Sequence, residues 1–128
     1  MSDNKQYVKD AMVTESKNFE AIAARLSNPE NIRILHAAIG LATEAGEVQD
    51  ALKKHLFYGK PLDKVNLAEE MGDIFWYMAI LSDALGVGFD DIQTKNIAKL
   101  KARYGDKFTA AAALNRDLDA ERKILESK

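Results

Sequence analysis

The 128-residue chain has no cysteine, two prolines, one tryptophan and no long apolar run. Without cysteine, disulfides and thiolate metal sites are excluded. The longest unbroken apolar segment, residues 74–81, is far shorter than the roughly 20 residues that a membrane-spanning helix needs. A net charge of −2 argues against nucleic-acid polymers and membranes as partners, because anionic surfaces bind basic proteins. The first residues contain no apolar segment typical of a signal peptide, so we expect a cytoplasmic protein.

What remains is typical of an all-α protein. The apolar content of 47% and charged content of 30% indicate a soluble globular chain, and no stretch alternates as a strand would. The apolar spacing predicts helices over about 3–26, 29–57, 63–85 and 90–104, then one or two short helices. Asn28 and Asp90 are expected as N-caps, with Pro29 in the first turn of the second helix. We expect one domain over 1–128, with a core in about 28–108 and a helical C-terminal tail in 109–128.

The most informative feature is an acidic pattern that occurs twice. Residues 41–48 read LATEAGEV, and residues 67–74 read LAEEMGDI. Each copy carries two acids three residues apart, which are Glu44 and Glu47 in the first copy and Glu70 and Asp73 in the second. Residues at i and i+3 lie on one side of a helix. Each copy therefore presents a pair of carboxylates to one side.

The two acid pairs are expected to face each other at the same height. A short connection near residues 58–61 makes the two helices antiparallel neighbours, and both pairs lie at nearly equal distances from it at about 1.5 Å of rise per residue. By helical phase, Glu44 and Glu70 border the apolar stripes, whereas Glu47 and Asp73 lie farther round. Four such carboxylates would repel strongly unless a cation neutralised them. Oxygen ligands suit Mg²⁺, with Mn²⁺ as a substitute; ordinary solvated acids remain the alternative.

Gly46 and Gly72 occupy the same place in the two copies, directly before the second acid. A glycine within a helix costs about 1 kcal/mol relative to alanine. We therefore expect these two glycines to allow close approach of two helix backbones.

Five polar residues are candidates for contact with phosphate. Tyr77 follows the second acid pair by one turn, and Lys54 follows the first by two. Asn96, Lys99 and Arg103 form one polar stripe on the fourth predicted helix. If this stripe faces the acids, it would supply hydrogen-bond donors and positive charge to a triphosphate. The alternatives are a half-buried tyrosine and solvated polar side chains without a specific role.

Trp76 falls on the side of its predicted helix opposite Leu67 and the core. Large aromatic side chains are seldom left exposed, so Trp76 indicates either a subunit interface or an aromatic wall for a base. Neither His36 nor His55 stands three residues after a glutamate, so the Glu-x-x-His signature of di-iron bundles is missing.

The doubled acid motif resembles the E-x-x-E…E-x-x-D signature of the MazG-like, all-α nucleoside triphosphate pyrophosphohydrolases. Residues 69–73, EEMGD, are close to the E-E-x-G-D form of that family. The stretch from about 36 to 108 matches in order and spacing, including Lys99-x-x-x-Arg103-Tyr104. The tail resembles that of small members that phages or mobile elements often carry, which would place the protein in a bacterial host.

The resemblance implies a four-helix-bundle core that assembles as a homodimer or homotetramer. The implied reaction is Mg²⁺-dependent hydrolysis of a (deoxy)nucleoside triphosphate to the monophosphate and pyrophosphate. Carried over by position, the metal ligands would be Glu44, Glu47, Glu70 and Asp73, and the phosphate contacts would be Lys54, Tyr77, Lys99 and Arg103. We expect Glu47 and Glu70 to be catalytic, with an acid not committed to metal accepting the proton of the attacking water.

Two other interpretations stay open. One is a non-catalytic helical interaction module, in which the acids are solvated and Trp76 marks a partner interface. The other is a related all-α enzyme, such as a dimeric dUTPase or a phosphoribosyl-ATP pyrophosphohydrolase, which shares the metal chemistry and differs in the base pocket.

Overall fold

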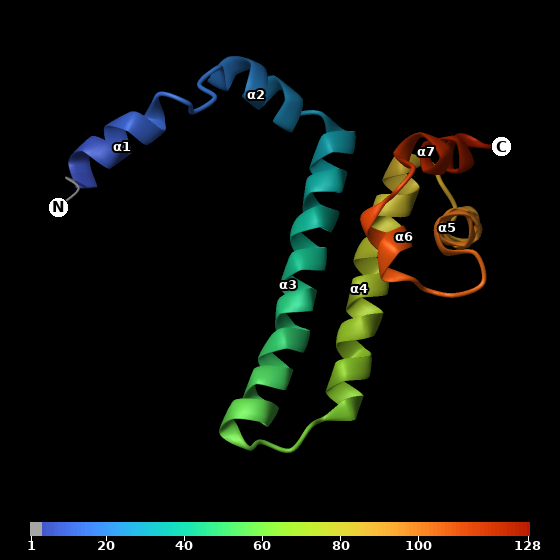
Figure 1. Cartoon of the computed structure of the whole chain (residues 1–128). Helices are drawn as coiled ribbons and strands as arrows, with labels where there is room; N and C mark the ends of the chain where they lie inside the picture. Colours follow the sequence, from blue (N-terminus) through green and yellow to red (C-terminus); the bar gives the residue numbers. More distant parts are fainter. Residues whose placement is uncertain (1–3) are drawn as a thin grey trace.

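A computed structural model describes residues 4–128 of the chain. Seven helices and no strand occur in this range, which confirms the all-α class. The helices are α1 (Asn4–Met12), α2 (Phe19–Leu26), α3 (Pro29–Tyr58), α4 (Lys64–Leu85), α5 (Phe89–Tyr104), α6 (Ala110–Leu114) and α7 (Leu118–Glu126). The two longest, α3 and α4, form an antiparallel hairpin (Figure 1).

Capping side chains and a glycine determine where the two helices of the hairpin begin and end. The Asn28 side chain accepts hydrogen bonds from the backbone N–H groups of Glu30 and Asn31, with Pro29 at the start of α3 as expected. Gly59 ends α3 with φ of 70°, a conformation that favours glycine. The Asp63 side chain then accepts the N–H of Asn66 and starts α4. These caps hold the turn that sets the two helices side by side.

Two predicted helix boundaries are wrong. The helix expected over about 3–26 is divided into α1 and α2, because the Asn18 side chain accepts the N–H of Ala21 and starts a new helix; the expected start at Asp3 lies outside the described residues. Gly88, not Asp90, is the N-cap of α5. Asp90 lies in the first turn instead, where its charge meets the positive end of the helix.

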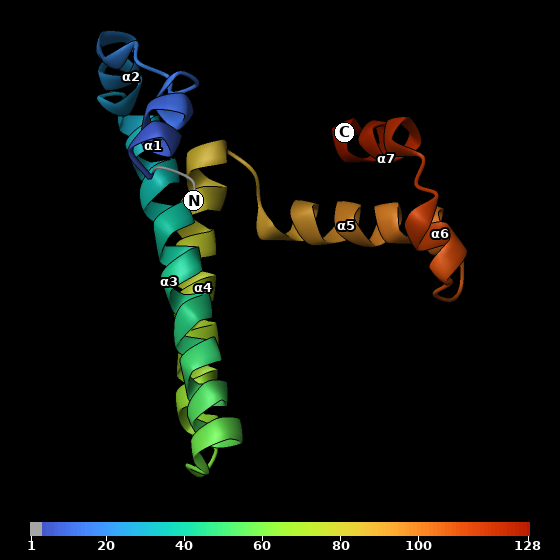
Figure 2. The same ribbon diagram turned by 60° about the vertical axis from the view of Figure 1, so that its left-hand side comes forward.

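The C-terminal arm, which we define as α5, α6 and α7, stands apart from the hairpin. α5 runs across the hairpin axis instead of along it (Figure 2), after a turn at Gly86 with φ of 67°. α7 folds back onto α5, and α6 joins the two. The arm therefore packs mainly on itself.

A single chain leaves many of its large apolar side chains exposed. Among residues 4–128, Ala37 is the only apolar side chain that is fully buried. The chain exposes 10409 Å², whereas a compact monomer of this mass would expose about 6,800 Å². One side of the hairpin, which we call the apolar face, exposes Leu52, Leu56, Met71, Phe75 and Leu85. The expected four-helix arrangement is thus not formed within one chain. None of the helices in the described range has the length and apolarity needed to cross a bilayer.

Candidate metal centre

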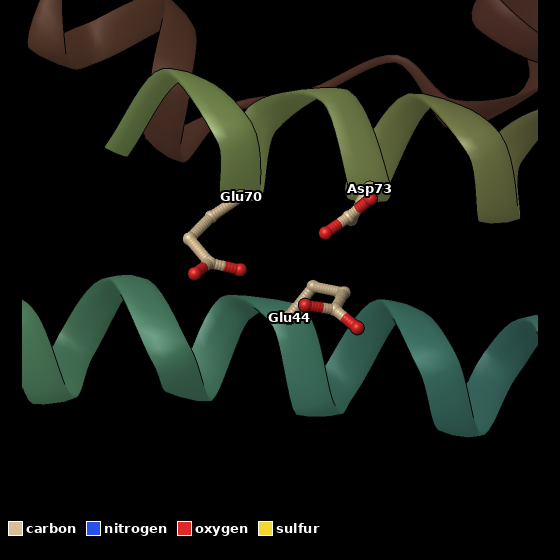
Figure 3. Close-up of side chains that lie close together, drawn as sticks. All are labelled: Glu44, Glu70 and Asp73. Atoms are coloured by element: carbon tan, nitrogen blue, oxygen red, sulfur yellow. The ribbon is translucent and has the colours of Figure 1, made fainter. Parts of the chain in front are cut away.

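Three of the four predicted metal ligands converge at the seam between α3 and α4. Glu44 comes from α3, and Glu70 and Asp73 come from α4. Each offers one carboxylate oxygen, and these oxygens all lie within 4.8 Å of one another (Figure 3). The sequence-based expectation that the two motifs lie level across the hairpin is confirmed for these three residues. We call them the acid cluster.

Burial within the acid cluster is graded as helical phase predicts. Glu44 and Glu70 are half-buried, whereas Asp73 is exposed. The Asn66 side chain, one turn before Glu70 on α4, donates a hydrogen bond to its carboxylate over 2.7 Å. Asn66 is not among the residues predicted from the sequence, although its i, i+4 spacing from Glu70 is the available signal. This bond orients the Glu70 carboxylate beside Glu44.

The crowding of acids shows in the electrostatics of Glu44. Burial, followed by a hydrogen bond with Glu70 and the charges of Asp73, Glu70 and Glu47, raises the pKa of Glu44 above its ordinary value. The charged form is therefore disfavoured while the acids face only one another. A divalent cation among these oxygens would offset the repulsion between the acids and favour their charged forms.

Glu47 lies outside the group of three close oxygens and is exposed. It lines a hollow of about 150 Å³ that also contains Lys54 and Asn66. Lys54 forms an ion pair with Asp50 one turn earlier, which raises the pKa of Lys54 and lowers that of Asp50. A cationic side chain thus stands beside the fourth acid.

The expected role of Gly46 and Gly72 is wrong. A Cβ at either position would have no atom within 4 Å in this chain, so the approach of α3 to α4 does not need them. The close approach occurs at Gly40, where a Cβ would lie 2.1 Å from the ring of Tyr77. Tyr77 therefore packs against the backbone of α3 one turn from Glu44, in a space that only glycine leaves open.

The polar stripe of α5 is not brought to the acid cluster of its own chain, because α5 leads away from the seam (Figure 2). Asn96 is exposed and Lys99 is half-buried. Arg103 donates from Nε and Nη2 to the carboxylate of Glu121 on α7, at 2.7 and 2.8 Å. This bidentate bond raises the pKa of Arg103. Glu121, which lies 18 residues from its partner, is not among the residues predicted from the sequence.

Comparison with known proteins gives a family and a relative. The family model of the MazG nucleotide pyrophosphohydrolase domain matches residues 35–108, which include both acid motifs and the α5 stripe. The "Gene 37 protein" of Mycobacterium phage L5 is 33% identical over 75 residues, covering 53% of this chain and 63% of that protein. The similarity thus spans less than two thirds of the relative's own length. No solved structure matches the chain significantly.

Proposed function

Because the chain belongs to the MazG nucleotide pyrophosphohydrolase family, we propose that it hydrolyses a (deoxy)nucleoside triphosphate to the monophosphate and pyrophosphate with Mg²⁺. The observation that carries this proposal is the acid cluster, in which Glu44, Glu70 and Asp73 bring carboxylate oxygens within 4.8 Å of one another. A phage-borne role in the cytoplasm of a bacterial host is part of the proposal, and the phage relative supports it.

The donor set fits a hard divalent cation. All three groups are carboxylates from two rigid helices, and carboxylate oxygen is a preferred ligand of Mg²⁺ and Mn²⁺. Glu44, Glu70 and Asp73 would hold the ion, and Glu47, one turn from Glu44, would complete the set or serve as base. When bound, the ion would neutralise phosphate charge and lower the pKa of a coordinated water.

The chain's own residues then have defined tasks. Water attacks the α-phosphorus, the bond from this phosphorus to the α,β-bridging oxygen breaks, and pyrophosphate leaves. Glu47 accepts the proton of the attacking water, since it is exposed and is not one of the three close oxygens. Glu70, held by Asn66, keeps its free oxygen directed at the reacting group. In this proposal, different acids therefore bind the metal ion and accept the proton.

Five polar residues would contact the phosphates. Lys54 lines the same hollow as Glu47, and Tyr77 lies one turn beyond Asp73. Asn96, Lys99 and Arg103 would reach the acids from a second copy of the chain, because α5 leads away from its own seam. Two donors of Arg103 are committed to Glu121 and its guanidinium also bonds Tyr104, so Arg103 would contribute its positive charge to the phosphate site more than free donors.

We also propose that the chain assembles as a homodimer or homotetramer, and the exposed apolar surface supports this. The excess of about 3,600 Å² per chain over a compact monomer is more than one partner's share of an obligate interface, since such interfaces bury about 2,000–5,000 Å² in total over both partners. Phe75, 54% exposed on the apolar face, would lie in that interface. By helical phase, Val65 points elsewhere on α4 although it is 81% exposed.

Light scattering on two matched variants tests the assembly. Phe75→Glu should lower the measured mass to that of the monomer or cause aggregation, because it places a charge in an apolar contact. Val65→Glu should keep the mass of the wild-type assembly. A monomeric wild-type protein, or equal effects of both changes, would contradict the proposed interface.

The activity is tested by pyrophosphate release over a panel of common and damaged (d)NTPs with Mg²⁺ or Mn²⁺. We expect release from at least one of them, its loss in Glu70→Gln, and its retention in Glu69→Gln, the neighbouring acid outside the cluster. Circular dichroism should show the same helical signal in all three proteins. If the folded wild-type chain released pyrophosphate from none of these substrates, the non-catalytic interaction module would replace this proposal. Preference for dUTP or phosphoribosyl-ATP would instead assign one of the related enzyme classes.

A further inference from the structure

Three aromatic rings meet beside the acid cluster. The ring centroids of Trp76 and Tyr77 lie 5.0 Å apart, those of His36 and Tyr77 5.7 Å, and those of His36 and Trp76 6.5 Å. All three pairs are close to perpendicular, with interplanar angles of 77–81°. Tyr77 is itself seated on the backbone of Gly40. The indole of Trp76 is therefore held by edge-to-face contacts instead of rotating freely.

The aromatic group lies on the acid-cluster side of the hairpin. At about 100° per residue, Trp76 and Tyr77 fall about 60° and 40° to either side of Asp73. Phe75, on the apolar face, falls about 160° away from Asp73. Trp76 is thus separated from the surface that would pack against a second hairpin.

Trp76 is anchored but not covered. Its exposed fraction is 56%, although a large aromatic side chain gains most from burial. Along the helix axis it stands about 4.5 Å beyond Asp73, and His36 stands about 12 Å beyond Glu44. A nucleotide whose α-phosphate lies at the acid cluster carries its base one sugar farther on, which is the region that this ring occupies.

We propose that Trp76, oriented by Tyr77 and His36, stacks on the base of the substrate and so selects base-bearing triphosphates over inorganic polyphosphate. The proposal rests on the proposed function for the position of the phosphates. Stacking suits any base, since every base has a π-face. Trp76 would therefore supply affinity for a nucleoside as a class, and the polar groups around it would choose among bases.

Fluorescence offers a direct test, because Trp76 is the only tryptophan in the chain. The wild-type protein is titrated with a non-hydrolysable α,β-methylene (d)NTP and, separately, with inorganic tripolyphosphate, both with Mg²⁺. Excitation is at a wavelength where the bases do not absorb. The nucleotide analogue should change the emission in a saturable way, whereas tripolyphosphate should compete for the site and leave the emission unchanged. Equal changes with both ligands would overturn the proposal.

Kinetics of two variants separate stacking from structure. Trp76→Leu should raise KM for the nucleotide by about tenfold, in line with the loss of one base–aromatic stack, while kcat and the inhibition by tripolyphosphate change little. Trp76→Phe should recover most of the affinity. An unchanged KM in Trp76→Leu would overturn the proposal, and a change in subunit number instead of KM would show that the ring serves assembly. Either result leaves wild-type hydrolysis intact, whereas failure of the proposed function removes hydrolysis from the wild-type protein itself.

Discussion

The α3–α4 hairpin and the C-terminal arm both contain carboxylates that are buried or half-buried, but the groups that surround these carboxylates differ. In the arm, Glu121 is only 5% exposed and accepts hydrogen bonds from Arg103 and from Arg116, whose Nη2 lies 2.6 Å away. In the hairpin, Glu44, Glu70 and Asp73 face one another, and within residues 4–128 none of the three forms an ion pair. The arm supplies the positive charge that neutralises Glu121, whereas no cationic side chain in the described range is paired with the acid cluster.

The pKa values show what this difference means. The two guanidinium groups lower the pKa of Glu121 to about 2, so its charge is favoured by folding. Burial and neighbouring acids raise the pKa of Glu44, so its charge is disfavoured. An acid that the chain itself neutralises stabilises the fold, whereas acids gathered without a cation indicate a ligand from outside the chain. Carboxylates therefore stabilise the fold in the arm, whereas in the hairpin they indicate a ligand-binding site.

The largest expected difference is in activity. Glu44→Gln should lower kcat by more than about 100-fold, since it removes a metal ligand and even outer partners of such ligands contribute 10–100-fold. Its melting temperature in metal-free buffer should hold or rise, because one of several like charges is removed. Steady-state pyrophosphate release and thermal melting measure the two effects.

Thermal melting with added Mg²⁺ completes this prediction. The wild-type melting temperature should rise with the ion concentration, by an amount equivalent to about 2.7 kcal/mol at a hundred times the dissociation constant. Glu44→Gln should lose most of that rise. A variant that kept both the Mg²⁺ shift and the activity would place the ion elsewhere.

The matching change in the arm should act on stability. Glu121→Gln leaves Arg103 and Arg116 without a counter-charge, so the melting temperature should fall by several degrees and α7 should exchange its amide hydrogens faster. Glu126→Gln is the control, because its ion pair with Arg122 is exposed on the same helix and such pairs contribute little. Equal melting of both variants would contradict the structural role of Glu121.

A smaller effect is expected from acid. The folded pKa of Glu121, about 2, lies below its ordinary value of 4.5, so the stability it contributes is present above pH 4.5 and is lost as the pH falls toward 2. The melting difference between the wild-type protein and Glu121→Gln should therefore shrink across this range. A difference independent of pH would mean that packing, not charge, holds α7.

The local signals in the sequence were sufficient for the hairpin. Asn28, Pro29, Gly59 and Asp63 set its ends through side-chain caps and a left-handed turn, all within a few residues of the chain. The acid cluster was predictable for the same reason: a short turn, and equal numbers of residues from it on both helices, determine which residues lie level. The oxygen group of Glu44, Glu70 and Asp73 therefore lies where the pattern placed it.

Contacts between residues far apart in the chain could not be predicted from the sequence. The bond from Arg103 to Glu121 depends on how α7 returns to α5, which no periodicity describes. Gly46 and Gly72 were assigned to close packing from their matching positions, whereas the position that a side chain would block is Gly40, opposite Tyr77. The prediction of Asp90 as an N-cap rested on residue type alone, whereas the helix begins two residues earlier and Gly88 is the N-cap.

The central claim is that the acid cluster holds a divalent cation, and anomalous X-ray scattering from crystals grown with Mn²⁺ tests it most directly. The account predicts one strong peak between the α3 and α4 motifs, within coordination distance of carboxylate oxygens of Glu44, Glu70 and Asp73. A well-ordered hairpin whose acids turn toward solvent without a peak, or a peak bound by other residues alone, would contradict it.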